Sequence, residues 1–382
     1  IERTTGPTDK VCGDFLSVEA VESLLRLGVD PARLGGERIG RLRLIHGHRM
    51  AETALPFPAF GLTRRTLDEA LLRQAASVGA RVIRGVTARG LAASARGVTV
   101  RADPLGEVGA DAVFLATGKH DLRQTARPGR TGGPVGWKMY FALSPAQREA
   151  LRGCIELMLF PGGYAGLQCV EGGSAVLCLL TSQAWLAASG AGAGGVLDAV
   201  AACCPHLRER LRGATPGLER PLAVAGLPYG YLYQPAPGHF QAERQPENVL
   251  ALCFAEQIHA YARSVLRRSA PDNPDGQDAG GPAVSRLFRL GDQVGVIPSF
   301  TGDGVAIALH SAALAAQAWL SDDDADAYHR RMRRHLRGQM RLASALHRGC
   351  MTPGLQPWLV RIARASPAIV RLLARSTRLR AA

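Results

Sequence analysis

The sequence contains very little lysine: only Lys10, Lys119 and Lys138 stand beside forty-three arginines. The net charge of +14 therefore rests almost wholly on arginine, a ratio typical of GC-rich coding. Such a charge favours anionic partners, including nucleic acid, a membrane surface or a phosphate-bearing ligand. Because the basic residues are scattered and no basic stripe interleaved with aromatic residues occurs, we expect no nucleic-acid partner.

Long apolar runs and paired cysteine motifs are also absent. No run approaches the ~18 apolar residues of a membrane-spanning helix, and no secretory signal is visible. The eight cysteines form no CxxC motif, so we expect reduced thiols in the cytoplasm. The stretch Cys203-Cys204-Pro205-His206 contains residue types that bind metals. Two adjacent cysteines in a helix-to-turn segment more often pack in the core, so we expect no metal site.

Familiar catalytic motifs are missing too, with no GxSxG, no HExxH and no aligned His/Asp pair. Residues 190–195 read Gly-Ala-Gly-Ala-Gly-Gly, formally a GxGxxG. That fingerprint binds a pyrophosphate only when a strand runs directly into the loop and a helix follows. The strand expected before it ends near Leu180, and "TSQAWLAAS" intervenes. We therefore interpret 190–195 as a flexible linker.

The first part of the chain alternates helix and strand signals. In 61–80, apolar residues at 67, 71, 75 and 78 predict one helix face, stopped by Gly79. Short β-type runs follow, "RVIRGVTA" and "RGVTVRA". The wholly apolar "DAVFLATG" (111–118) is typical of a parallel strand buried on both faces.

The pattern changes after about residue 135. Strand-length runs are separated by Gly162-Gly163 and Gly172-Gly173, which predicts an antiparallel meander with tight hairpins. The Pro-, Gly- and Asp-rich stretch 234–286 indicates a flexible loop or insertion with one helix around 250–267. Residues 303–320 are apolar on nearly every side of a helix, which predicts a buried helix there.

The C-terminal part, 322–382, reads as helical and basic, broken at Pro353, Pro357 and Pro367. Its amphipathic pattern allows two interpretations. The helices can lie on an anionic membrane, at its inner face. They can equally dock on the protein's own body, which is the interpretation we favour.

One segment carries a specific resemblance. "RLGDQVGVIPSFTGDGVAIALHSA" (289–312) resembles the second flavin-contacting segment of FAD-dependent oxidoreductases of the aromatic hydroxylase and geranylgeranyl reductase superfamily. The resemblance implies that Asp292, after Gly291, binds the ribityl chain and that Pro298 turns beside the isoalloxazine. It also places the amides of Gly302 and Gly304 at the N1/O2 edge. A helix N-terminus suits the negative charge of reduced flavin, and glycine lets the backbone approach a flat ring.

Other stretches resemble the same family, over roughly 1–235 and 287–320. "GLTRRTLDEALLRQAASVGA" implies that Arg64 lies near the cofactor, and "DAVFLATGKH" implies the same for Gly118. "KVCGDFLS" resembles the segment that follows the second Rossmann strand in the reductase-like branch. The long stretch 234–286 departs from the family pattern, in which the sheet leads quickly to the Gly-Asp strand.

The opening residues fit this resemblance as the end of that second strand. Glu2 and Arg3 would then bind the adenosine part of FAD, with Glu2 on the ribose. Some thirty residues carrying the first strand and its GxGxxG loop would precede Ile1, so we expect an N-terminally truncated chain. Genomic sequence just upstream tests this expectation.

The expected fold is α/β: a Rossmann-like FAD-binding domain with an inserted antiparallel sheet and a helical C-terminal tail. The expected parts, in chain order, are 1–134 (FAD-binding, first part), 135–235 (antiparallel β substrate domain), 236–286 (insertion), 287–320 (FAD-binding, second part) and 321–382 (helical region).

The resemblance implies an FAD-dependent oxidoreductase, favoured as a monooxygenase that hydroxylates a small apolar or phenolic substrate through a flavin hydroperoxide. NAD(P)H is a candidate reductant, although no second dinucleotide fingerprint occurs. One alternative is a reductase of isoprenoid C=C bonds, and another is a non-catalytic remnant unable to hold FAD. No acid–base residue stands out, which is expected where a cofactor carries the chemistry.

The three lysines give a further hypothesis. All lie in family-like segments, and an ammonium differs from a guanidinium in fit and titration. We expect Lys10 and Lys138 to contact the cofactor or substrate, and Lys138 is also a weak catalytic candidate. The alternative is that these lysines are incidental.

Overall fold

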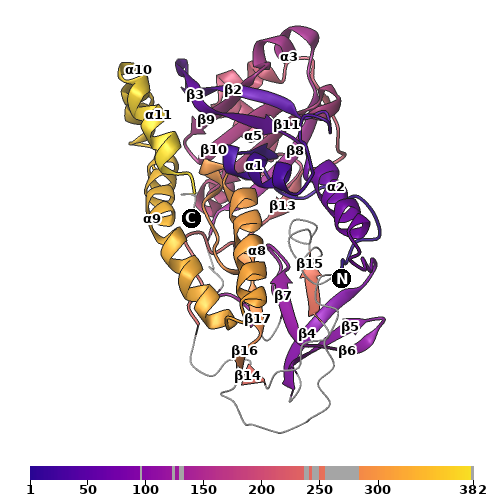
Figure 1. The fold of residues 1–382 in the computed structure, drawn as a ribbon. Helices are drawn as coiled ribbons and strands as arrows, with labels where there is room; N and C mark the ends of the chain where they lie inside the picture. The colour runs from indigo at the N-terminus through magenta and orange to yellow at the C-terminus, as the bar shows by residue number, and fades with distance from the viewer. Residues whose placement is uncertain are drawn as a thin grey trace, which may run out of the picture.

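The computed structural model describes residues 1–94, 97–122, 125–128, 133–235, 241–242, 249–253 and 284–379. A large mixed sheet forms one end of the described molecule, smaller sheets form the other, and the helix α8 runs between them (Figure 1). Further helices cover one side (Figure 1). This α/β architecture agrees with the fold class expected from the sequence.

The large sheet has nine strands among the described residues. In spatial order they are β1 (Phe15–Leu16), β3 (Arg49–Gly61), β2 (Glu37–His46), β9 (Cys154–Phe160), β10 (Gly163–Cys169), β11 (Ala175–Thr181), β8 (Val135–Ala142) and β12 (Thr215–Pro216), with β13 (Leu222–Val224) also paired to β8. All pairs are antiparallel except β2 with β9. The predicted meander is therefore present, with β9, β10 and β11 as consecutive antiparallel neighbours.

The predicted domain limits stay predictions, but the large sheet draws on both sides of residue 135. Strands β2 and β3 come from 37–61, and β2 pairs with β9. This pairing brings the N-terminal part of the chain onto the same sheet as the meander.

Three smaller sheets complete the strand inventory of the described residues. They are the parallel sheet β15 (Val249–Cys253), β7 (Ala112–Ala116) and β17 (Leu287–Arg289), the antiparallel sheet β4 (Thr87–Ser94), β5 (Gly97–Asp103) and β6 (Gly106–Ala110), and the pair β14 (Gln241–Ala242) with β16 (Val284–Ser285). Every residue of β7 is buried, which confirms the parallel strand predicted from "DAVFLATG".

One prediction within 234–286 was wrong. Residues 249–253 form the strand β15 beside β7, whereas the sequence suggested a helix from about 250. A short continuous apolar run fits a parallel strand and a buried helix equally well, so periodicity could not decide. The rest of that predicted helix lies outside the described residues.

The α-helices in the described residues are α1 (Val18–Arg26), α2 (Arg64–Ser77), α3 (Pro145–Leu151), α4 (Gln183–Ser189), α5 (Val196–Cys203), α6 (Pro205–Arg210), α8 (Gly304–Leu320), α9 (Ala325–Met351), α10 (Gln356–Ala365) and α11 (Pro367–Ser376). Helix α2 begins where the Thr63 side chain accepts a hydrogen bond from the Thr66 amide, and it buries Leu67, Leu71 and Ala75 as predicted. Helix α8 is buried along most of its length, also as predicted.

The Gly-rich stretch 190–195 follows the helix α4, not a strand, and precedes the helix α5. Gly190 ends α4 in the left-handed conformation, with φ of 63°. Rejecting 190–195 as a dinucleotide loop is therefore supported by the structure.

The C-terminal helices pack on the large sheet. In α10, Val360 and Ala363 are buried, and both α10 and α11 contact β3. The buried Gln356 amide donates to the carbonyl oxygens of Phe160 (2.8 Å) and Cys350 (2.7 Å), which ties α10 to the end of β9. None of the described helices combines the length and the apolar composition needed to cross a bilayer.

Glu156 links β9 to its neighbours through a buried charge cluster. Its carboxylate accepts hydrogen bonds from Arg43 on β2 (2.9 Å) and Arg210 on α6 (2.8 and 2.9 Å), and lies 2.9 Å from His206 Nε2. Burial alone would raise the pKa of Glu156, but the hydrogen bonds from His206 and Arg210 lower it to about 2.

We predict that Glu156→Gln lowers the free energy of unfolding by about 3–5 kcal/mol at neutral pH, because it removes the buried anion that the partly buried Arg43 and Arg210 share. A carboxyl with a depressed pKa stabilises the fold above its unfolded pKa, near 4.5, and loses that effect as the pH falls through about 2. The difference from wild type should therefore shrink over this range in urea titrations. Glu149→Gln, at an exposed pair with Arg152, is the control and should change stability by less than about 1 kcal/mol. An equal effect of the two variants would contradict the prediction.

Candidate functional site

A cavity of about 600 Å³ lies between the large sheet, the start of α8 and the C-terminal helices. Its wall draws on residues 3–15, on 116–120 at the end of β7 and beyond it, on 290–305 before and within α8, and on α10 and α11. The large sheet adds an apolar floor of Leu42, Leu44, Leu55, Ile155 and Leu157.

Alternation along β9 explains this floor. Ile155 and Leu157 face the cavity, whereas Met158 and Phe160 belong to the core beneath α5 and α6. Successive side chains of a strand point to opposite faces, so one strand serves both purposes.

Most cofactor residues predicted from the sequence border this one cavity. Those that line it are Arg3, Lys10, Arg64, Gly118, Gly291, Asp292, Gly302 and Gly304. Glu2 and Pro298 are not among the described lining residues, although their neighbours Arg3, Ile297 and Ser299 are. The structure thus brings the predicted residues together, and their binding role stays a prediction.

The segment 290–304 turns sharply into α8 at the cavity wall. Gly291 has φ of 55°, and its amide donates to Ser311 Oγ at 2.9 Å. Gly302 has φ of 72°, which only glycine adopts readily. Helix α8 begins at Gly304, so its first amides, which lack partners within the helix, lie at the cavity.

Glycine leaves the wall open at three points. At Gly13, Gly118 and Gly304, apart from the adjoining backbone, no atom of a described residue lies within 4 Å of the place where a Cβ would stand, and all three glycines line the cavity. A flat ring could therefore approach the bare backbone there. At Gly302, by contrast, a Cβ would stand 2.7 Å from the ring of Phe15.

Glu2 lies beside this region in a short parallel bridge with Arg84. Its side chain is 2% exposed, and Oε1 accepts hydrogen bonds from the amide and hydroxyl of Thr4 at 2.9 and 2.8 Å. Its other oxygen, Oε2, is buried and accepts no hydrogen bond from a described residue. A buried oxygen without a partner is costly unless a ligand or water satisfies it.

Lys10 and Arg64 share one carboxylate, Asp68, at the edge of the cavity. Lys10 Nζ lies 2.5 Å from Asp68 Oδ2, and Arg64 Nε donates to Oδ1 at 2.7 Å. Burial alone would raise the pKa of Asp68, but the charges of Arg64 and Lys10 lower it below its usual value. These two cations are therefore held together at the wall.

Lys138 lies behind the wall and does not line the cavity, although the sequence suggested it as a weak catalytic candidate. Its ammonium donates to Asp14 Oδ2 at 2.6 Å and to the carbonyl oxygen of Lys10 at 3.0 Å. Burial alone would lower the pKa of Lys138, but the Asp14 carboxylate raises it above its usual value. Lys138 therefore acts as a positioning residue for the segment 9–14.

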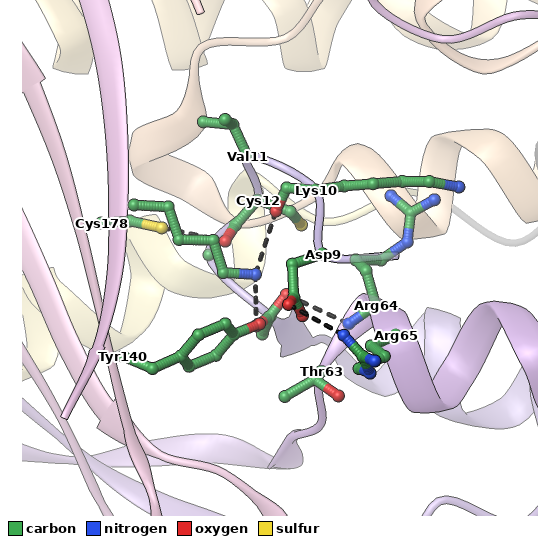
Figure 2. A network of polar contacts seen from close by, with 12 residues as sticks. Asp9, Lys10, Val11, Cys12, Thr63, Arg64, Arg65, Tyr140 and Cys178 are labelled. Atoms are coloured by element: carbon green, nitrogen blue, oxygen red, sulfur yellow. Dashed lines mark hydrogen bonds and ion pairs between the residues drawn. The ribbon is translucent and has the colours of Figure 1, made fainter. Parts of the chain in front are cut away.

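Further polar contacts hold this segment (Figure 2). Cys178 Sγ donates to the carbonyl oxygen of Cys12 at 2.9 Å, as Figure 2 shows. Tyr140 Oη donates to Asp14 Oδ2 at 2.9 Å, and Lys119 donates to the carbonyl oxygen of Val11. Asp14 has φ of 52°, an uncommon conformation for a residue with a side chain.

Two charged residues that sequence reasoning missed meet at the start of α8. Asp303 is fully buried, and Arg378 Nη1 lies 2.5 Å from its Oδ1. Arg378 Nη2 also donates to the carbonyl oxygen of Thr301 at 2.7 Å. Burial raises the pKa of Asp303 to about 7, against the lowering effect of Arg378. Asp303 lies between Gly302 and Gly304, so the glycine motif could have drawn attention to it. No local sequence pattern distinguishes Arg378 from the other C-terminal arginines.

Comparisons with known proteins identify the fold. No family model matches the sequence, and no curated protein matches it. Among solved structures, the chain is similar to flavin-dependent proteins, and its fold is the α/β fold of that group, as the resemblance implied.

Three of these structures superpose on nearly the whole chain. The flavin-dependent brominase Bmp2 matches with a TM-score of 0.68 and 14% identity, covering 98% of this chain and 85% of its own. The myxobacterial chondrochloren halogenase CndH matches with 0.68 and 18% identity, covering 99% and 84%. A flavoprotein/dehydrogenase from Cytophaga hutchinsonii matches with 0.68 and 13% identity, covering 98% and 85%.

We predict that Lys138→Met lowers the free energy of unfolding by about 3–5 kcal/mol, because it leaves the Asp14 carboxylate buried without its cation. Adding Asp14→Asn should restore much of the loss, since asparagine is neutral and tolerates a positive φ. Unfolding in urea, followed by circular dichroism, measures both effects. Arg89→Met, at a surface pair with Asp103, is the control and should change stability by less than about 1 kcal/mol. Failure of Asp14→Asn to rescue would show that the lost charge is not the cause.

Proposed function

We propose that the cavity binds FAD and that the protein is an FAD-dependent oxidoreductase. The observation that carries this proposal is the bare glycine backbone at Gly13, Gly118 and Gly304, facing one cavity where α8 begins. A site open to a flat ring, beside a helix N-terminus, suits a cofactor that gains negative charge when reduced. The similar structures are named as flavin-dependent proteins, which supports the same cofactor.

The residues present fit the different parts of this cofactor. The amides at the start of α8 and the Asp292 carboxylate would face the flavin end, while Arg3 would face the adenosine end. Glu2, next to Arg3, does not line the cavity, and its buried Oε2, which accepts no hydrogen bond from a described residue, is the acceptor we propose for the ribose. Lys10 and Arg64 hold a positive patch at the wall that suits a phosphate. Bound FAD supplies two-electron redox chemistry and, when reduced, reaction with O2.

The apolar floor over the sheet supports a small apolar or phenolic substrate. Tyr229 lies at this end, and its hydroxyl is 2.6 Å from Ser299 Oγ. Burial raises the pKa of Tyr229 to about 12, so its phenol stays neutral and can donate a hydrogen bond. Together these residues can orient a substrate that carries one polar group and keep bulk water away from it.

The favoured reaction is oxygenation of this substrate, with NAD(P)H as candidate reductant. A second candidate is halogenation, because several similar structures are named as halogenases or as a brominase. Reduction of an isoprenoid C=C bond is a third reaction that the same fold could support.

The visible spectrum and product analysis test these proposals in order. Protein that shows flavin absorption, as purified or after adding FAD, supports the cofactor, and colourless protein that ignores FAD supports a non-catalytic chain. With NAD(P)H and phenolic substrates, a hydroxylated product supports the oxygenase. A product that carries bromine or chlorine only when the halide is added supports the halogenase, and anaerobic turnover of an isoprenoid supports the reductase.

We predict that Gly304→Leu weakens FAD binding by about 10-fold or more, equal to about 1.4 kcal/mol, because its side chain would fill the open space in the wall. Gly304 does not have a positive φ, so the backbone accepts a side chain without strain. The control is Gly338→Leu, on an exposed part of α9 where nothing lies within 4 Å of a Cβ. Titration of FAD followed by flavin fluorescence measures both variants, and equal affinities would refute the placement of the cofactor.

A further inference from the structure

Helices α10 and α11 expose large apolar side chains although both helices pack on the sheet. Trp358 is 57% exposed and Leu372 is 63% exposed, and neither lines the cavity. The other exposed large apolar side chains here are Leu355, just before α10, and Ile362 and Ile369. Monomeric soluble proteins rarely gather such residues in one place without a partner.

Arginines accompany these apolar side chains on α10 and α11. Arg361, Arg364, Arg371 and Arg375 are exposed on the same two helices, and the guanidinium of Arg361 lies 4.8 Å from the ring centre of Trp358. We call these arginines, together with Trp358 and Leu372, the tail face. It combines a cation-rich rim with apolar tips, a pattern typical of helices that lie in a lipid interface.

The charge of the whole sequence is concentrated in this part of the chain. Arginines occur throughout, but no acidic residue follows Asp326, whereas thirteen arginines do. Residues 327–382 therefore carry +13 of the formal net charge of +14, and the preceding residues are close to neutral. A membrane with anionic headgroups attracts such a segment by about 1 kcal/mol for each basic residue near its surface.

We propose that the tail face docks on the surface of an anionic lipid bilayer, with Trp358 and Leu372 entering the interface and the four arginines binding headgroup phosphates. Nucleic acid would satisfy the arginines but leave the aliphatic side chains in water, so a lipid surface fits the combination better. A second copy of the chain would also cover the apolar side chains, and the experiments below separate this occupant from a lipid surface.

The tail face adjoins the cavity wall. Ile362 follows Trp358 by one helical turn, Ile369 precedes Leu372 by three residues, and both isoleucines line the cavity. Docking would thus place the apolar end of the cavity near the bilayer. If the proposed function holds, this position suits a substrate that dissolves in lipid.

Vesicle flotation tests the docking directly, without any need for catalysis. The full chain should float with vesicles made of equal parts phosphatidylglycerol and phosphatidylcholine, and much less with phosphatidylcholine alone. Replacing Arg361, Arg364, Arg371 and Arg375 by glutamine should lower the partition coefficient by about 100-fold or more. Trp358→Ser with Leu372→Ser should also reduce binding, and Trp358 emission should shift to the blue on binding in the wild type.

A matched control removes the same charge elsewhere. Arg33, Arg89, Arg152 and Arg212 are 55–89% exposed and lie in surface ion pairs outside the tail face. Their replacement by glutamine should leave most of the vesicle binding intact. Equal losses in both quadruple variants, or no flotation of the wild type, would overturn the proposal.

Two further measurements keep the interpretation unambiguous. Light scattering without lipid that shows a dimer, lost in Trp358→Ser with Leu372→Ser, would identify the face as an interface between copies and overturn lipid docking. The flavin spectrum, recorded on the same samples, reports the cofactor separately, so a failure of FAD binding and a failure of vesicle binding remain distinguishable.

Discussion

The buried contact between Lys138 and Asp14 determines where the cavity wall runs. Asp14 has a positive φ, which costs free energy in a residue with a side chain unless the surroundings hold it. Lys138 comes from β8, and the amide that also donates to Asp14, that of Arg64, begins α2. One carboxylate therefore joins the sheet, the helix and the segment 9–14.

The same arrangement explains why lysine persists in a chain that otherwise uses arginine. The ammonium of Lys138 is fully buried between two acceptors, Asp14 and the carbonyl oxygen of Lys10. A guanidinium has five donors in a rigid plane, and two acceptors in so small a space would leave several of them unpaired. Lys119 reaches the neighbouring carbonyl oxygen of Val11, and Lys10 belongs to the segment itself. The three lysines thus converge on one short segment, a role that the hypothesis of direct cofactor contact did not include.

Sequence patterns correctly predicted those helices, strands and hairpins whose capping residues, periodicity or turn glycines lie within the element itself. Capping and periodicity marked α2, the apolar run marked β7, and paired glycines marked the hairpins around β10. Most residues predicted to contact a cofactor also lie around one cavity, because the motif at 289–312 carries both a turn and a helix start.

The strand β15 was missed because a five-residue apolar run has no distinguishing period. The parallel pairing of β2 with β9 and the contact of Arg378 with Asp303 join residues far apart in sequence, so no local pattern encodes them.

The contact between Arg378 and Asp303 makes the electrostatic potential at the head of α8 dependent on pH. Below about pH 7 the Asp303 carboxyl is neutral, so the helix terminus and the guanidinium together present net positive charge to the cavity. Above that value the carboxylate offsets the guanidinium, and the positive potential falls. The chain thereby holds, beside its candidate redox site, a group whose charge changes close to neutrality, and any electron acceptor bound there would become harder to reduce as the solution turns alkaline.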